Sequence, residues 1–136
     1  LNGLLGAGVP QDWAAHRSGY ELTILYGLDH AQTLACLVPA MLKIRAGDKR
    51  QKLLQYADRV WGINSGDEDA RVNEAINKTS AFFESMGLPT RLSAYGIKGD
   101  CIPRILTKLK EHGMINLGER KDVTLEVMQK ILENCL

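Results

Sequence analysis

The chain has 136 residues, which is long enough to bury one hydrophobic core as a single domain. Its 17 basic and 16 acidic residues leave a net charge of +1, so the composition gives no basic surface for nucleic acid or anionic membranes. Hydrophobic residues make up 45% of the chain, but no apolar run approaches the roughly 20 residues of a membrane-spanning helix, and no secretory signal is visible. These features predict a globular cytoplasmic domain.

The first ten residues, LNGLLGAGVP, are rich in glycine. Gly6 and Gly8 form a short GxG, but they lack the GxGxxG spacing of a phosphate-binding loop and no predicted strand precedes them. We expect them to allow a turn, or close helix packing, before Pro10.

Two predicted helices follow, over residues 11–26 and 30–45, and a glycine separates them. Gly27 is the residue type most common just past a helix end. Asp29 followed by Gln32 predicts an N-cap with a capping box. The second helix is apolar nearly all round, which predicts that it lies at the centre of the core.

His16 and His30 lie on either side of this corner. On one unbroken helix they would be roughly 21 Å apart, but a turn at Gly27 allows two imidazoles to approach one metal ion. The spacing permits a shared site without establishing it, since two ordinary polar residues near helix ends would give the same pattern. Tyr20 follows His16 by four residues, so the two side chains share one helix face.

Two neighbouring residues have alternative interpretations. Gly19 weakens its helix locally, either because a cofactor or substrate approaches the backbone or because another helix packs there. Asp29 either caps the second helix or orients a metal ligand, and we favour the cap.

Further helices are predicted from apolar residues at helical spacing, separated by a polar turn at 64–69 and a connector at 88–99. They cover 48–61, then the segment from the polar turn to Met86, 101–113 and 124–134. Asp48 and Asp100 are the expected N-caps. The fourth helix is expected to direct a set of mainly apolar side chains inward: Ala75, Ile76, Thr79, Phe82, Phe83 and Met86. No stretch alternates with period two, so we predict an all-α fold, an irregular bundle of about six helices.

Three cysteines and a third histidine complete the candidates. Cys36, Cys101 and Cys135 are odd in number and contain no CxxC pair, which favours free or buried thiols in a reducing cytoplasm. His112 lies at the end of a predicted helix, where an imidazolium is favourable. We expect it to be a surface capping residue and not a third metal ligand.

Several segments resemble the iron-containing alcohol dehydrogenase family, in particular its branch of NADPH-dependent aldehyde reductases and butanol-type dehydrogenases. They are GAGVPQDWAAH, GYELTILYGLDHAQTL, LVPAML, KRQKLLQYADRVWGI, FFESMGLPTRLSAYGI and LKEHGMINLGE. That family has a His-x3-His-x9-His pattern whose first and third histidines bind the metal. The resemblance implies that His16 and His30 are ligands of Fe²⁺ or Zn²⁺. The middle histidine, near nicotinamide and substrate, is Tyr20 here, which makes Tyr20 the candidate catalytic and cofactor-binding residue.

The resemblance also implies that residues 1–136 are most of the helical, metal-binding domain of a longer enzyme. The family's other ligands, spaced Asp-x3-His, and its glycine-rich nucleotide-binding region belong upstream of Leu1. The implied activity is interconversion of aldehydes and primary alcohols with NAD(P)H. The implied partners are a missing N-terminal nucleotide-binding domain, which would cover an exposed apolar surface, and a second subunit in a homodimer. We expect the chain alone to bind metal weakly and to be inactive. The alternative is a stand-alone, non-catalytic helical scaffold or interaction module.

Overall fold

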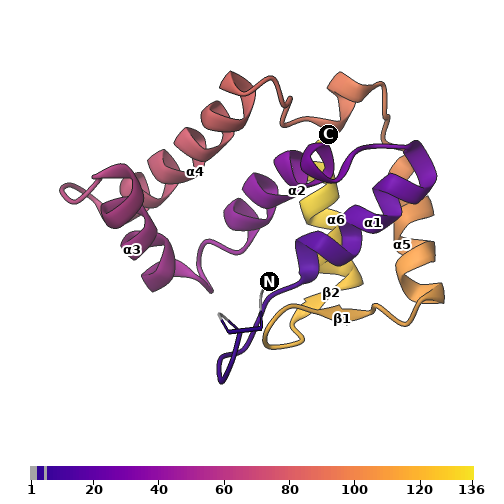
Figure 1. The fold of residues 1–136 in the computed structure, drawn as a ribbon, viewed down its shortest axis with the longest axis horizontal. Coiled ribbons are helices and arrows are strands. Elements are labelled where there is room, and N and C mark those ends of the chain that lie inside the picture. The colour runs from indigo at the N-terminus through magenta and orange to yellow at the C-terminus, as the bar shows by residue number, and fades with distance from the viewer. Residues whose placement is uncertain (1–2, 5) are drawn as a thin grey trace.

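The computed structural model describes residues 3–4 and 6–136, and this part of the chain forms a helical bundle (Figure 1). Its helices are α1 (Ala14–Tyr26), α2 (His30–Ile44), α3 (Arg50–Trp61), α4 (Glu68–Ser85), a 3-10 helix (Leu92–Tyr95), α5 (Cys101–Glu111) and α6 (Leu125–Asn134). The predicted all-α bundle of about six helices is therefore confirmed. None of the helices described is both long enough and apolar enough to cross a lipid bilayer.

Helix α2 is the centre of the bundle, as its apolar surface predicts. It packs against α1, α4 and α6, and α5 packs against both α1 and α6 (Figure 1). The main core is built from fully buried side chains of these helices, among them Leu22, Leu37, Ile105 and Ile131. Removing these surfaces from water is the main stabilising contribution to the bundle.

Helices α3 and α4 form a second, smaller core on one side of the molecule (Figure 1). Leu53 and Leu54 of α3 contact Val72 and Ile76 of α4, and Leu42 from the end of α2 packs against them. The hairpin of α3 and α4 therefore has an apolar contact of its own in addition to its contact with α2.

The predicted corner between α1 and α2 is confirmed. Gly27 has a φ of 70°, and its N–H donates to the carbonyl of Thr23 at 2.9 Å, which ends α1. Gln32 accepts a hydrogen bond from the N–H of Asp29 at 2.9 Å, and the two residues form the predicted capping box of α2. Local signals alone thus reverse the chain direction between the two histidines.

Asp48 does not cap α3, contrary to the prediction. Lys49 occupies the N-cap position, and the Asp48 carboxylate accepts a hydrogen bond from Nε of Arg45 at 2.8 Å. The buried Arg45 also pairs with Asp122, with 2.6 Å between Nη2 and Oδ2. A buried guanidinium requires charged partners, and this requirement draws Asp48 away from the helix end. Asp100 occupies the N-cap position of α5, but its side chain makes no capping hydrogen bond.

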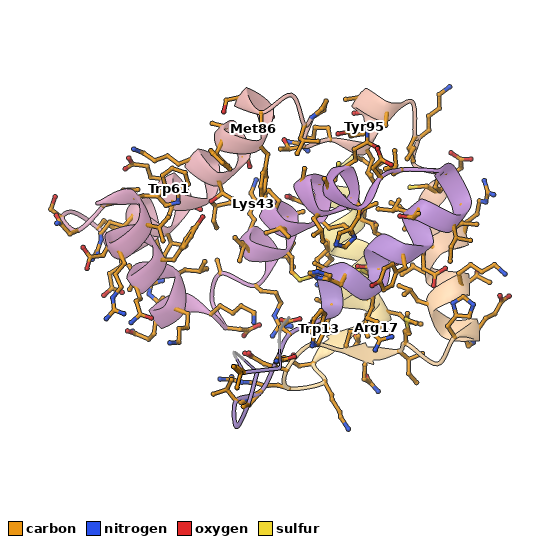
Figure 2. All side chains as sticks on the ribbon, in the orientation of Figure 1. Trp13, Arg17, Lys43, Trp61, Met86 and Tyr95 are labelled. Carbon is orange, nitrogen blue, oxygen red and sulfur yellow. The ribbon has the colours of Figure 1, made fainter. Side chains whose placement is uncertain are left out.

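The C-terminal turns of α4 are more exposed than predicted. Ala75, Ile76 and Thr79 are buried as expected, but Phe82 is 51% exposed and Met86 is 65% exposed. Met86 lies at the end of α4 remote from Trp61, beyond the small core that α4 shares with α3 (Figure 2). The inward placement predicted for these two side chains was therefore wrong.

One feature is missing from the sequence prediction, a short antiparallel hairpin before α6. Strands β1 (Asn116–Leu117) and β2 (Val123–Thr124) pair two residues each, which is too short for a period-two pattern. The hairpin places Val123 in the main core, and Thr124 serves as the N-cap of α6.

The three cysteines are buried free thiols, as predicted. Burial raises the pKa of Cys36 and of Cys135 to about 12. Because the thiolate is the reactive form, we expect a disulfide reagent at about pH 8 to modify none of the three thiols rapidly in the folded chain, and all of them after unfolding in guanidinium. Counting modified thiols with time measures this, and rapid modification of the folded chain would contradict the burial described here.

Candidate functional site

The rings of His16 and His30 meet across the corner between α1 and α2. Their centroids are 5.0 Å apart, and their planes are inclined at 55°. Two imidazoles on one tetrahedral metal, with bonds of about 2.1 Å, have centroids roughly 5 Å apart. The separation of the two rings therefore fits a shared metal ion, and the geometric expectation that they approach one another is confirmed.

Two aromatic side chains from α1 flank the histidine pair. The Tyr20 ring is stacked on His30 with 6.2 Å between centroids, and the Trp13 ring meets His16 edge-on at 5.1 Å. Tyr20 is 49% exposed, and Trp13 lies at the N-terminal end of α1 (Figure 2). His30 is exposed and His16 is half-buried, so the four rings form one surface that a ligand can approach from solvent.

Gly19 explains how α1 approaches α2 closely enough for the rings to meet. A Cβ atom at Gly19 would lie 2.9 Å from Oγ1 and 3.3 Å from Cβ of Thr33. Thr33 is fully buried, and its hydroxyl donates to the carbonyl of His30 at 2.8 Å. Of the two interpretations of Gly19, close packing against another helix is the one that the structure supports.

Burial lowers the pKa of His16 below its usual 6.5, and the neighbouring His30 lowers it further. The folded chain then binds a proton at His16 less readily than the unfolded chain. The stability that neutral His16 contributes is complete above pH 6.5 and is lost as the pH falls towards the lowered pKa. We expect the unfolding temperature of the chain to fall between about pH 7 and about pH 5, and to fall less steeply in His16→Asn. An unfolding temperature that falls equally steeply with pH in the two proteins would contradict this.

The part of the chain that the structure describes does not complete a set of metal donors. The described residues contain no group of three or more histidine, cysteine, aspartate or glutamate side chains that could hold a metal ion. Two imidazoles supply half of a tetrahedral shell. The site fits a metal only if other donors complete it.

His112 is 44% exposed, as expected of a surface residue, but it does more than cap a helix. It occupies the C-cap position of α5, and its Nδ1 lies 2.7 Å from Oε1 of Glu21. The Glu21 side chain is only 1% exposed. The sequence analysis did not identify Glu21. Its position was nevertheless indicated, because Glu21 follows the buried Ala14 and Ser18 at helical spacing and so lies on the inner face of α1.

The comparisons with known proteins agree over the whole chain. The profile of the "Fe-containing alcohol dehydrogenase family, C-terminal" matches residues 4–136. The NADPH-dependent aldehyde reductase YqhD of Escherichia coli is 57% identical over 98% of this chain and 34% of its own length. A probable NADH-dependent butanol dehydrogenase of Bacillus subtilis is 32% identical over 100% of this chain and 35% of its own. The chain thus spans about a third of these relatives.

Two solved structures have the same arrangement of helices. The crystal structure of E. coli YqhD matches all of this chain and 35% of its own, with a TM-score of 0.97 and 56% identity. The NADH-dependent butanol dehydrogenase A of Thermotoga maritima matches 99% of this chain and 36% of its own, with a TM-score of 0.89 and 23% identity. At that lower identity the likeness concerns the fold alone.

Proposed function

Because the chain belongs to the Fe-containing alcohol dehydrogenase family, we propose that it is the metal-binding helical part of an NAD(P)H-dependent enzyme. That enzyme would reduce aldehydes to primary alcohols and catalyse the reverse reaction. The observation that carries the proposal is the approach of His16 and His30 to 5.0 Å from two different helices. Relatives described as NADPH-dependent and NADH-dependent are both similar to this chain, so the proposal covers either cofactor.

His16 and His30 would supply two nitrogen ligands to Fe²⁺ or Zn²⁺, since imidazole suits both metals. When bound, the metal would act as a Lewis acid towards the substrate oxygen. The lowered pKa of His16 supports the assignment, because only the neutral imidazole has a free nitrogen lone pair for coordination.

Tyr20 would lie beside the two ligands on the same surface. Its ring is stacked on His30 and half-exposed, so its hydroxyl can reach a bound molecule and donate a hydrogen bond to it. We propose contact with the substrate or with the nicotinamide. This contact would orient the reacting carbonyl.

The remaining ligands and the nucleotide-binding domain would come from the part of the enzyme that corresponds to the other two thirds of the relatives. Trp13, Tyr20 and Ile24 form an exposed apolar stripe along α1 beside the half-buried His16, which supports a docking surface there. The chain alone would then have no dehydrogenase activity. The buried free thiols suit the reducing cytoplasm that we propose as its location.

A fusion protein, called the joined protein below, tests this function. In it, the part of the E. coli aldehyde reductase that precedes the matched region is fused to residues 4–136 of this chain. We expect NADPH-dependent reduction of a short aldehyde by the joined protein and none by the chain alone. The unmodified E. coli enzyme is the positive control.

The second candidate is a non-catalytic helical scaffold. The incomplete donor set within the described residues favours it, as does Tyr20 in place of the family's middle histidine. A joined protein that folds and binds NADPH but neither binds metal nor reduces aldehyde would support the scaffold and contradict the enzyme.

A further inference from the structure

A buried carboxylate joins α1 to α5 away from the histidine pair. Oε1 of Glu21 lies 2.7 Å from Nδ1 of His112, and the Glu21 side chain is 1% exposed. The second oxygen, Oε2, is buried without a hydrogen-bond partner among the described residues. His112 itself is 44% exposed.

Stability alone does not account for this pair. Burying a carboxylate is costly, and an oxygen left without a partner adds to the cost. Replacement of a buried polar or ionic group by an apolar side chain of similar volume is often neutral or stabilising. A leucine at position 21 would fill this space in the α1–α5 contact without an unpartnered oxygen.

The pair does have a geometric consequence for the site. With about 100° of rotation per helical residue, Gly19 lies about 60° to one side of His16, and Glu21 lies about 100° beyond Tyr20 on the other side. Gly19 faces Thr33 of α2, and Glu21 faces His112 at the end of α5. The stripe that carries His16 and Tyr20 is therefore flanked by two contacts of α1 with neighbouring elements, one on each side.

We propose that Glu21 and His112 are positioning residues whose contact locks the rotation of α1, so that His16 and Tyr20 face His30. The relevance of this lock to metal binding rests on the proposed function. The lock itself is a property of the folded chain and can be measured without metal.

The test replaces the pair by apolar side chains, in Glu21→Leu/His112→Leu. The first readout is the nuclear Overhauser effect between the ring protons of His16 and His30 in the metal-free chain. The second is the affinity for Zn²⁺ measured by calorimetry. We expect a cooperatively folded variant that has lost the ring-to-ring signal and binds Zn²⁺ at least about 10-fold more weakly. A variant that keeps the signal and binds Zn²⁺ within a factor of about two would overturn the proposal.

Controls separate positioning from a general loss of order. Lys108→Met/Glu111→Gln removes the neighbouring ion pair of α5, with 2.6 Å between Nζ and Oε2, and should leave both readouts unchanged. His112→Asn retains an amide donor near the position of Nδ1 and should restore the ring-to-ring signal, whereas His112→Leu alone should not. These single variants decide the matter if the double variant does not fold. If the wild-type chain shows the signal but binds Zn²⁺ too weakly to measure, the ring-to-ring signal of the variants alone decides the proposal, and the metal assignment is tested separately in the joined protein.

Discussion

The His30→Ala variant of the joined protein is expected to contain no bound metal after purification. His30 lies in the first turn of α2, where its side chain is exposed, so alanine leaves the core unchanged. Only one of the two converging imidazoles would remain. Loss of a metal ligand exceeds the 10- to 100-fold losses of affinity that are typical of residues behind the ligands, so we expect more than about a 100-fold loss. Elemental analysis of the purified protein measures the metal content.

Tyr20→Phe is the matched control for this experiment. Phenylalanine retains the stacked ring beside His30 but removes the hydroxyl, so the metal content should equal that of the parent. Aldehyde reduction should fall if the hydroxyl orients the substrate. Full metal content in the His30→Ala variant would reject His30 as a ligand, whatever the activity of the Tyr20 variant.

Gly19→Val should lower the free energy of unfolding of the chain by about 3 kcal/mol, because it overpacks the contact between α1 and α2. A Cβ atom there already approaches Oγ1 of Thr33 to 2.9 Å, and valine adds two methyl groups. Gly19→Ala should lower the free energy of unfolding by less, because alanine recovers up to about 1 kcal/mol of helix propensity. Denaturant unfolding measures both changes.

A second substitution shows whether the clash is the cause. Thr33→Ala removes the nearest atom, Oγ1, and leaves Cβ at 3.3 Å, so Gly19→Ala/Thr33→Ala should be more stable than the sum of the two single changes predicts. Strict additivity would mean that Gly19 is required for another reason. Gly19→Val should also weaken the contact between the rings of His16 and His30, because it pushes apart the helices that carry them.

The features of the site that depend on neighbouring residues could be predicted from the sequence. Gly27 ends one helix, and Asp29 with Gln32 begins the next, each by hydrogen bonds to nearby backbone or side chains. These signals place His16 and His30 on either side of a sharp corner. The resemblance to the family adds the metal, and the structure adds the 5.0 Å separation of the rings.

The features that were missed depend on residues far apart in the chain. Glu21 and His112 are 91 positions apart, so the pattern within α1 indicates burial but does not reveal the partner. Asp48 has the sequence of an N-cap, but Arg45, which also binds a residue 77 positions away, competes for it. Phe82 and Met86 continue the apolar stripe of α4, but burial of a helix face requires neighbouring helices along its whole length.

The separate core of α3 and α4 means that the molecule need not open as one unit. Since these helices pack on each other and on α2, amide hydrogens in the hairpin are expected to exchange with solvent through a partial opening of lower free energy than global unfolding. Amides of α2 and α6 should exchange only when the whole bundle unfolds. The corner that carries the two imidazoles would then stay folded while the hairpin opens. Mutations that loosen α3 would leave the contact between His16 and His30 intact.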